Sequence, residues 1–306
     1  ILDLQGNGGG YLNAAIDLAN EFLGQKELIV YTEGRTAQRS EFFAKGNGDF
    51  RTGRLIVLVD EYTASASEIV SGAVQDWDRG IIVGRRSFGK GLVQRPIDLP
   101  DGSMIRLTIA RYYTPAGRCI QKPYDSSTDY NKDLIERFNH GELMNADSIH
   151  FPDSLKVQTK KLKRTVYGGG GIMPDYFVPI DTTLYTDYHR NLVGKGVIIK
   201  FTMKFIEDHR KELADKYKKF EHFNEKFIID DDMLATLREM GEKEGVKFNE
   251  EQYQKSLPLI KTQLKALIAR DLWDMNEYFR VMNATNESVQ KALEILRSGE
   301  YQKKLK

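Results

Sequence analysis

The chain has 306 residues, enough for one large or two ordinary domains, and 41% of them are hydrophobic, which predicts a packed core rather than disorder. Its formal net charge of +1 gives no bulk field that would attract nucleic acid or an anionic membrane, so neither partner is expected. The sequence contains no run of about 18 apolar residues and therefore predicts no transmembrane segment.

Cysteine and histidine usage gives no sign of a metal or another cofactor. The single cysteine, Cys119, permits neither an intrachain disulfide nor a cysteine-built metal cluster. The five histidines stand at no metal-ligand spacing: His140, His150, His189, His209 and His222. We expect no metal site and no cofactor.

The first segment combines a short apolar run with a glycine-rich turn. Ile1–Leu4 has the character of a strand, Gly6–Gly10 contains four glycines in five positions, and a helical period begins at Tyr11. A strand, glycine turn and helix in this order can present backbone N–H groups to an anion. A tight connection without a ligand explains the glycines equally well. A dinucleotide fingerprint is excluded, because Tyr11 occupies its third glycine position.

The next strands are expected at Leu28–Tyr31 and Leu55–Val59, and the second of these has the continuous apolar pattern of a buried strand. A helical stripe follows and places a helix start at Ser65. Ser65 and Glu68 have the spacing of a capping box, which is a purely structural role. A serine at such a strand-to-helix turn can also act as a nucleophile, with the N–H of Ala66 close to a developing oxyanion.

A third strand, Ile81–Val83, leads into a glycine-flanked loop that contains Lys90. The loop has most of a P-loop pattern, but Gly91 stands where the magnesium-binding hydroxyl should be, and a strand pattern follows instead of a helix. Burial of Lys90 beside Phe88 and Leu92 would favour the neutral amine, which can serve as a general base. A solvated loop lysine is the alternative.

The remainder of the first half predicts a hairpin and an irregular region. Leu92–Leu99 and Met104–Tyr113 have strand patterns on either side of an Asp-Gly turn. The polar segment 124–163 is expected to form loops with one short helix. Four glycines from Gly168 to Gly171 indicate a place where the chain passes close to another segment.

The composition changes near Asp181, where glycines become rare and Lys and Glu recur among periodic apolar residues. We therefore predict a domain boundary there and a helical region over 181–306. One helical stripe contains Leu264, Leu267, Ile268, Leu272 and Met275, and another contains Val289, Ala292, Leu293 and Leu296, after a cap at Asn286.

Ser65 and Lys90 are 25 residues apart and follow two consecutive strands. Parallel pairing of these strands would bring both turns to one edge of a sheet, where sites in such folds gather. No histidine lies nearby in the sequence, so a Ser–Lys pair is a more economical arrangement than a Ser–His–Asp triad.

Four strings in this order, DLQGNGGG, TASASEIVSGAVQD, GRRSFGKGLVQ and VYGGGGIMPD, resemble the carboxyl-terminal processing (tail-specific) serine peptidases over about residues 1–180. The resemblance implies a crotonase-like (ClpP-type) α/β peptidase core at 1–180. In this family pattern Ser65 is the nucleophile, Lys90 the general base and Gln94 the residue that orients the lysine. The oxyanion hole would be the backbone N–H groups of Ala66 and Gly10, with Gly9 as the alternative to Gly10.

The same resemblance implies a serine endopeptidase that cleaves proteins with apolar tails near their C-termini, through an acyl-enzyme and without a cofactor. It places the protein on the periplasmic side of the bacterial envelope and predicts a PDZ domain upstream of Ile1. Gln5 departs from the pattern, where arginine is usual. The helical region 181–306 lies outside the resemblance. Its mixed-sign charges from Lys204 to Lys226 indicate a solvated helix face, and an oligomer or partner contact is the alternative.

Two other functions are compatible with these residues. One is a non-catalytic binding or scaffold protein on the same fold, in which Ser65 is only a helix cap. The other is a crotonase-like acyl-CoA enzyme, in which paired N–H groups hold a thioester enolate and Lys90 is not needed.

Overall fold

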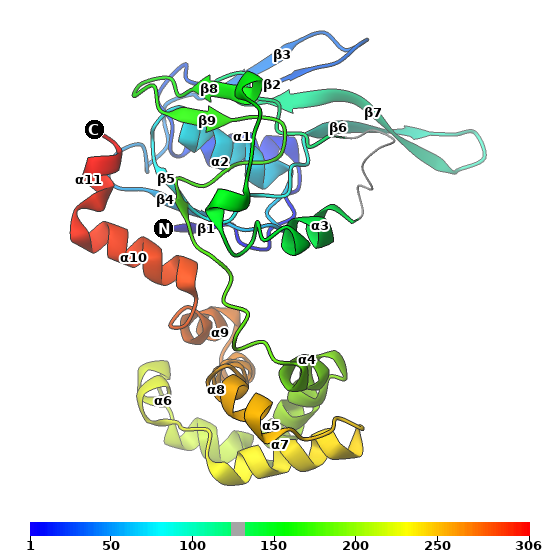
Figure 1. The fold of residues 1–306 in the computed structure, drawn as a ribbon, viewed down its shortest axis with the longest axis vertical. Coiled ribbons are helices and arrows are strands. Elements are labelled where there is room, and N and C mark those ends of the chain that lie inside the picture. Colours follow the sequence, from blue (N-terminus) through cyan, green and yellow to red (C-terminus); the bar gives the residue numbers. More distant parts are fainter. Residues whose placement is uncertain (124–131) are drawn as a thin grey trace. The chain divides into compact units, whose positions relative to one another are not determined.

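The computed structural model describes residues 1–123 and 132–306, and it divides them into two compact units (Figure 1). The first unit consists of Ile1–Pro179 together with Lys291–Lys306, and the second is Ile180–Gln290. The chain thus leaves the first unit after Pro179 and returns to it at the C-terminal helices. Residues 124–131, the start of the predicted polar segment, lie outside the described residues.

The first unit is built on a four-stranded parallel sheet in the order β1-β4-β5-β10. Its central strands, β4 (Ile56–Val59) and β5 (Ile81–Gly84), are buried at every position, as their continuous apolar sequences require. The edge strands are β1 (Leu2–Asp3) and β10 (Tyr176–Phe177). All strands of this sheet end at the edge where the serine and lysine turns lie.

A second sheet is antiparallel, with the strand order β3-β2-β7-β6. Its strands are β2 (Leu28–Glu33), β3 (Ser40–Phe43), β6 (Leu92–Asp98) and β7 (Met104–Tyr113). Helices α1 (Leu12–Asn20) and α2 (Ala66–Asp76) lie between the two sheets and share one apolar core with both (Figure 1). Every residue of α2 is buried, so the helix that follows Ser65 is fixed on all sides.

Smaller elements complete the first unit. A two-stranded ribbon is formed by β8 (Lys156–Gln158) and β9 (Thr165–Tyr167), and the only α-helix described in this region is α3 (Asp133–Asn139). Short 3₁₀ turns occupy Ala146–Ser148 and Asp153–Leu155.

The second unit is helical and has its own core of aromatic and aliphatic side chains. Its helices are α4 (Asp187–Gly194), α5 (Val197–Lys216), α6 (Phe220–Lys226), α7 (Asp231–Lys243), α8 (Glu250–Leu272) and α9 (Met275–Met282). The sequence predicted one helical stripe from Leu264 to Met275, and this was wrong for Met275, which belongs to the next helix. The helix ends at Leu272, because the Asp274 carboxylate accepts a hydrogen bond from Asn276 N and caps a new helix.

The C-terminal helices α10 (Glu287–Ser298) and α11 (Glu300–Lys304) return the chain to the first unit. The predicted cap at Asn286 is confirmed, since its side-chain oxygen accepts a hydrogen bond from Val289 N at 3.1 Å. Tyr301 is buried, and its hydroxyl accepts a 2.9 Å hydrogen bond from Leu55 N, immediately before β4. The α/β core followed by a mainly α-helical region, which the sequence predicts, is therefore present.

Among the described residues, no helix combines the length and the hydrophobicity needed to cross a membrane.

Candidate active site

Ser65 occupies a strained turn between the buried strand β4 and the buried helix α2. Its backbone angles are φ 58° and ψ −115°, a conformation that a residue with a side chain adopts at a cost of about 1–3 kcal/mol. The side chain is partly exposed, whereas the residues on either side of it are buried. A small hydroxyl side chain is thus held at the carboxyl end of the sheet on a rigid support.

The opening glycine turn packs directly against this serine turn. A Cβ atom added to Gly9, whose φ is +91°, would lie 2.5 Å from the carbonyl oxygen of Ala64 and 2.7 Å from the nitrogen of Ala66. Only glycine fits such a position, because both the space and the backbone angle exclude a side chain. The two turns that the sequence analysis assigned to one site are therefore in contact.

Asn7 holds the two turns together. Its side-chain oxygen accepts hydrogen bonds from Gly9 N and from the Ser67 hydroxyl, both at 2.9 Å, and its carbonyl accepts one from Ala64 N at 3.0 Å. The N–H of Gly9 is consequently occupied. Within the described part of the chain, the N–H groups of Gly10 and Ala66 have no hydrogen-bond partner.

Gly10 and Ala66 also line the same small cavity, which has a volume of about 130 Å³. Most of the other residues around it are apolar, among them Leu4, Leu18 and Val70. Two free N–H donors beside an apolar cavity can hold a developing oxyanion while an apolar side chain is bound next to it.

Glu68 connects the serine turn to the lysine loop. Its Oε2 atom accepts hydrogen bonds from Ser65 N and Lys90 N, both at 2.8 Å, and its Oε1 atom accepts them from Gly89 N at 2.7 Å and the Ser87 hydroxyl at 2.5 Å. The carboxyl is fully buried, and this burial raises its pKa, while the four hydrogen bonds act in the opposite direction. The turns of Ser65 and Lys90 are therefore brought together, as the sequence predicted.

Further contacts fix the lysine loop. Phe88 N donates to Thr63 O at 2.9 Å, and the buried Arg85 side chain forms a 2.6 Å ion pair with Glu61. The predicted close passage at the second glycine run is confirmed, because a Cβ on Gly171 would lie 2.5 Å from Ser87 O.

The lysine itself differs from the expectation. Lys90 is exposed rather than buried beside Phe88 and Leu92, and these two neighbours are themselves only partly buried. Gln94 is also exposed, next to an irregularity in the β6–β7 pairing between Val93 and Gln94. Neither side chain has a hydrogen-bond partner among residues 1–123 and 132–306, so the structure joins Lys90 to Ser65 through backbone contacts.

Three residues with structural importance for the site were not assigned to it from the sequence. Glu68 was recognised only as half of a local capping box. Asn7 gave no signal apart from its place among glycines. Asp60 accepts hydrogen bonds from Gly6 N at 2.9 Å and from Thr63 N at 2.9 Å, and thereby joins the ends of β1 and β4.

No group of three or more His, Cys, Asp or Glu side chains in the described ranges is arranged to hold a metal ion. What the site offers is a partly exposed hydroxyl, a nearby lysine and two free N–H donors.

A serine on a strained strand-to-helix turn, with the following N–H left free, is the arrangement of α/β proteins that use a serine nucleophile. The model of Peptidase family S41 matches residues 1–128. This part of the chain is similar to that family, and the curated relatives that it matches are carboxyl-terminal processing proteases. A second model, a family of unknown function named DUF8443, matches residues 188–274 within the helical unit.

Two curated relatives illustrate the similarity. The carboxyl-terminal-processing protease of Synechocystis sp. is 48% identical over 40% of this chain and 28% of its own length. The chloroplastic C-terminal processing peptidase of Tetradesmus obliquus is 43% identical over 40% of this chain and 26% of its own length. The chain thus spans only about a quarter of the length of these relatives.

A solved structure of a photosystem II D1 C-terminal processing protease aligns with 60% of this chain and 35% of its own, at 30% identity and a TM-score of 0.41.

Proposed function

We propose that this chain carries the catalytic site of a serine endopeptidase of the carboxyl-terminal processing type. The observation that supports it most strongly is the contact between the Gly9 turn and the strained Ser65 turn, which leaves the N–H groups of Gly10 and Ala66 free beside one cavity. The family of residues 1–128 agrees with this activity.

In the proposed reaction, Ser65 Oγ attacks a peptide carbonyl and Lys90 Nζ accepts the proton of the hydroxyl. The N–H groups of Ala66 and Gly10 stabilise the negative oxygen of the tetrahedral intermediate. The protonated lysine then donates to the leaving amine, which departs and leaves an acyl-enzyme. A water molecule, deprotonated by Lys90, hydrolyses this ester.

The reaction requires Lys90 to act as a neutral amine. Lys90 is exposed in the described arrangement. A polypeptide substrate bound over the site would exclude water from the lysine, and an ammonium deprived of water releases its proton more readily. We propose that Gln94, four residues further along, orients the amine in that state. The apolar cavity beside Ala66 suits a small apolar side chain next to the cleaved bond.

The test is cleavage of an unfolded protein with an apolar C-terminal tail, measured with the natural gene product because the matched part of this chain spans only about a quarter of its relatives' length. We expect Ser65→Ala and Lys90→Ala each to abolish cleavage and Gln94→Ala to reduce it strongly. Wild-type cleavage by either of the first two variants would overturn the proposal.

Covalent labelling by a fluorophosphonate separates the two other functions. A scaffold protein in which Ser65 is only a cap would not be labelled at Ser65. An acyl-CoA enzyme would turn over a thioester substrate, and Lys90→Ala would leave that turnover intact. For location, we propose the periplasmic side of the bacterial envelope, on the strength of the family resemblance, and cell fractionation would test it.

A further inference from the structure

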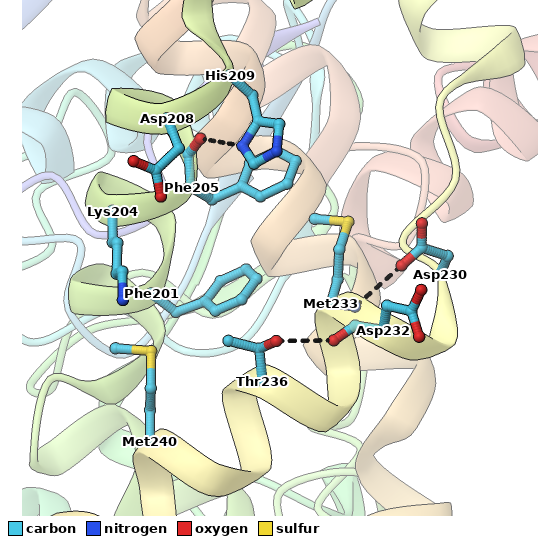
Figure 2. Close-up of a pocket in the computed structure, with 10 residues that line it drawn as sticks. All are labelled: Phe201, Lys204, Phe205, Asp208, His209, Asp230, Asp232, Met233, Thr236 and Met240. Atoms are coloured by element: carbon cyan, nitrogen blue, oxygen red, sulfur yellow. Dashed lines mark hydrogen bonds between the residues drawn. The ribbon is translucent and has the colours of Figure 1, made fainter.

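The helical unit contains a groove between α5 and α7 that has no part in the proposed peptidase reaction. Its volume is about 400 Å³, within the range of sites that bind ligands or side chains of a partner. Figure 2 shows that its walls come from two helices, with Phe201 and Phe205 on α5 facing Met233 on α7. The groove therefore lies within one unit and within the region matched by the DUF8443 model.

The floor of the groove is apolar and adaptable. Phe201 and Met233 are buried, and Phe205 and Met240 are partly exposed toward the opening. Methionine side chains are flexible and polarisable, and they are used at surfaces that accept apolar side chains of different shapes. Such a floor can accept apolar side chains of several shapes and is less suited to one rigid ligand.

An aromatic pair forms one wall. The ring of His209 stacks on Phe205 with a centroid distance of 4.5 Å, and His209 Nδ1 lies 2.9 Å from Phe205 O (Figure 2). The hydrogen bond fixes the orientation of the imidazole, so that the stacked pair presents a preformed aromatic surface. Aromatic surfaces of this kind attract guanidinium and ammonium groups.

The rim carries an excess of negative charge. Asp208 lies on α5, and Asp230 and Asp232 lie at the start of α7. None of these three carboxylates has an ion-pair partner among the described residues. Lys204 is the only lysine or arginine that lines the groove, so three carboxylates face one ammonium.

We propose that this groove binds a basic amphipathic segment of a protein partner, with an apolar side chain on the methionine and phenylalanine floor and flanking Lys or Arg side chains at the aspartates. In known complexes, an amphipathic helix places its apolar face in a hydrophobic groove, and a groove between two helices has a suitable shape for this. An acidic segment would place carboxylates beside the three aspartates, and an anionic membrane surface would be repelled in the same way. This function goes beyond the proposed peptidase activity and does not depend on it.

The experiment measures fluorescence anisotropy of a fluorescein-labelled peptide with Leu on one helical face and Lys on the other. It uses the whole chain carrying Ser65→Ala, so that cleavage cannot consume the probe. We expect saturable binding that weakens as salt is added, because salt screens exposed charges. A Glu/Leu peptide and a Lys/Ser peptide of the same length should bind far more weakly.

Two groove variants and a matched control locate the binding. Asp208→Asn combined with Asp232→Asn should weaken binding roughly fivefold, in line with the modest strength of exposed ion pairs. Asp215→Asn combined with Glu225→Gln removes the same charge from exposed positions elsewhere in the unit and should leave the affinity unchanged. Thr236→Trp fills the groove from an exposed position and should abolish binding.

Circular dichroism melting curves confirm that each variant is folded. The proposal is overturned if the Lys/Leu peptide does not bind, if the Glu/Leu peptide binds equally well, or if the groove variants bind as tightly as the charge-matched control.

Discussion

The backbone N–H groups of Ser65 and Lys90 donate to the same oxygen atom, Oε2 of Glu68, each over 2.8 Å. The backbone nitrogens of the two residues are thus held within two hydrogen-bond lengths of each other, independently of the conformations of their side chains. Glu68 thereby fixes the distance between the two turns independently of the orientation of the lysine side chain.

Glu68→Gln is expected to disturb both turns at once. The glutamine amide nitrogen cannot accept a hydrogen bond, so two of the four donors would lose their partner in a buried place. Each such loss costs about 1–3 kcal/mol. We predict a lower melting temperature and slower labelling of Ser65 by a fluorophosphonate. Ser71→Ala, one turn further along the same buried helix, is the control and should change neither much.

Gly9→Ala is expected to force the glycine turn away from the Ser65 turn and to block the site. The added methyl group would lie 2.7 Å from Ala66 N and would obstruct the space in front of that donor. Loss of one oxyanion donor typically lowers the rate about a hundredfold or more, and the rate of cleavage should fall by that amount. The matched control is Gly8→Ala, since a Cβ on Gly8 meets nothing within 4 Å. Equal activity of the two variants would contradict the role assigned to this contact.

Tyr301→Phe is expected to destabilise the first unit from the far end of the chain. The change leaves the N–H of Leu55 without the hydroxyl that accepts its hydrogen bond in a buried place, at a cost of about 1–3 kcal/mol. Chemical denaturation followed by the fluorescence of Trp77, in the first unit, would detect it. Tyr278→Phe removes a hydroxyl for which the described residues provide no hydrogen-bond partner, and it should have little effect. A normal denaturation midpoint for Tyr301→Phe would refute the prediction.

His189 is expected to make the helical unit sensitive to mild acid. It is buried, its Nε2 lies 2.9 Å from Gln263 Oε1, and its Nδ1 has no partner among the described residues. Burial lowers the pKa of the imidazole, so the unfolded chain binds a proton at a higher pH than the folded one. The free energy of unfolding therefore has its full value above about pH 6.5, the pKa of an unperturbed histidine. It declines as the pH falls below that value, because protonation of His189 favours the unfolded chain.

Hydrogen exchange of peptides from α4 and α8 at pH 7.5 and pH 5.5 measures this effect. Protection should fall at the lower pH in the wild type and change less in His189→Gln, which carries no titratable group. The prediction fails if the two proteins respond identically.

The sequence was sufficient for features that follow from local patterns and sheet geometry. Consecutive buried strands β4 and β5 pair in parallel, and for this reason the turns of Ser65 and Lys90 meet, as expected. The contact of the glycine turn with Ser65 was expected from the family resemblance, and its physical cause is the narrow space at Gly9. Both relationships can be predicted without knowing how the rest of the chain packs.

Other features depend on tertiary contacts that no local pattern records. The capping box of Ser65 and Glu68 was visible, but the bonds from Glu68 to Gly89 and Lys90 connect different elements. The flanking Phe88 and Leu92 suggested that Lys90 is buried, but both are only partly buried in the fold and Lys90 is exposed. The break at Asp274 was hidden because the apolar period continues across it.

The bond between Leu55 and Tyr301 joins residues that are 246 positions apart in the chain. A growing polypeptide folds from its N-terminus, domain by domain, as it leaves the ribosome. Here the strand that precedes Ser65 is made before the helical unit, and the tyrosine that completes the buried end of that strand is made after it. The first unit therefore cannot be completed until the whole helical unit has been synthesised, so any product that stops before Tyr301 lacks this support of the strand.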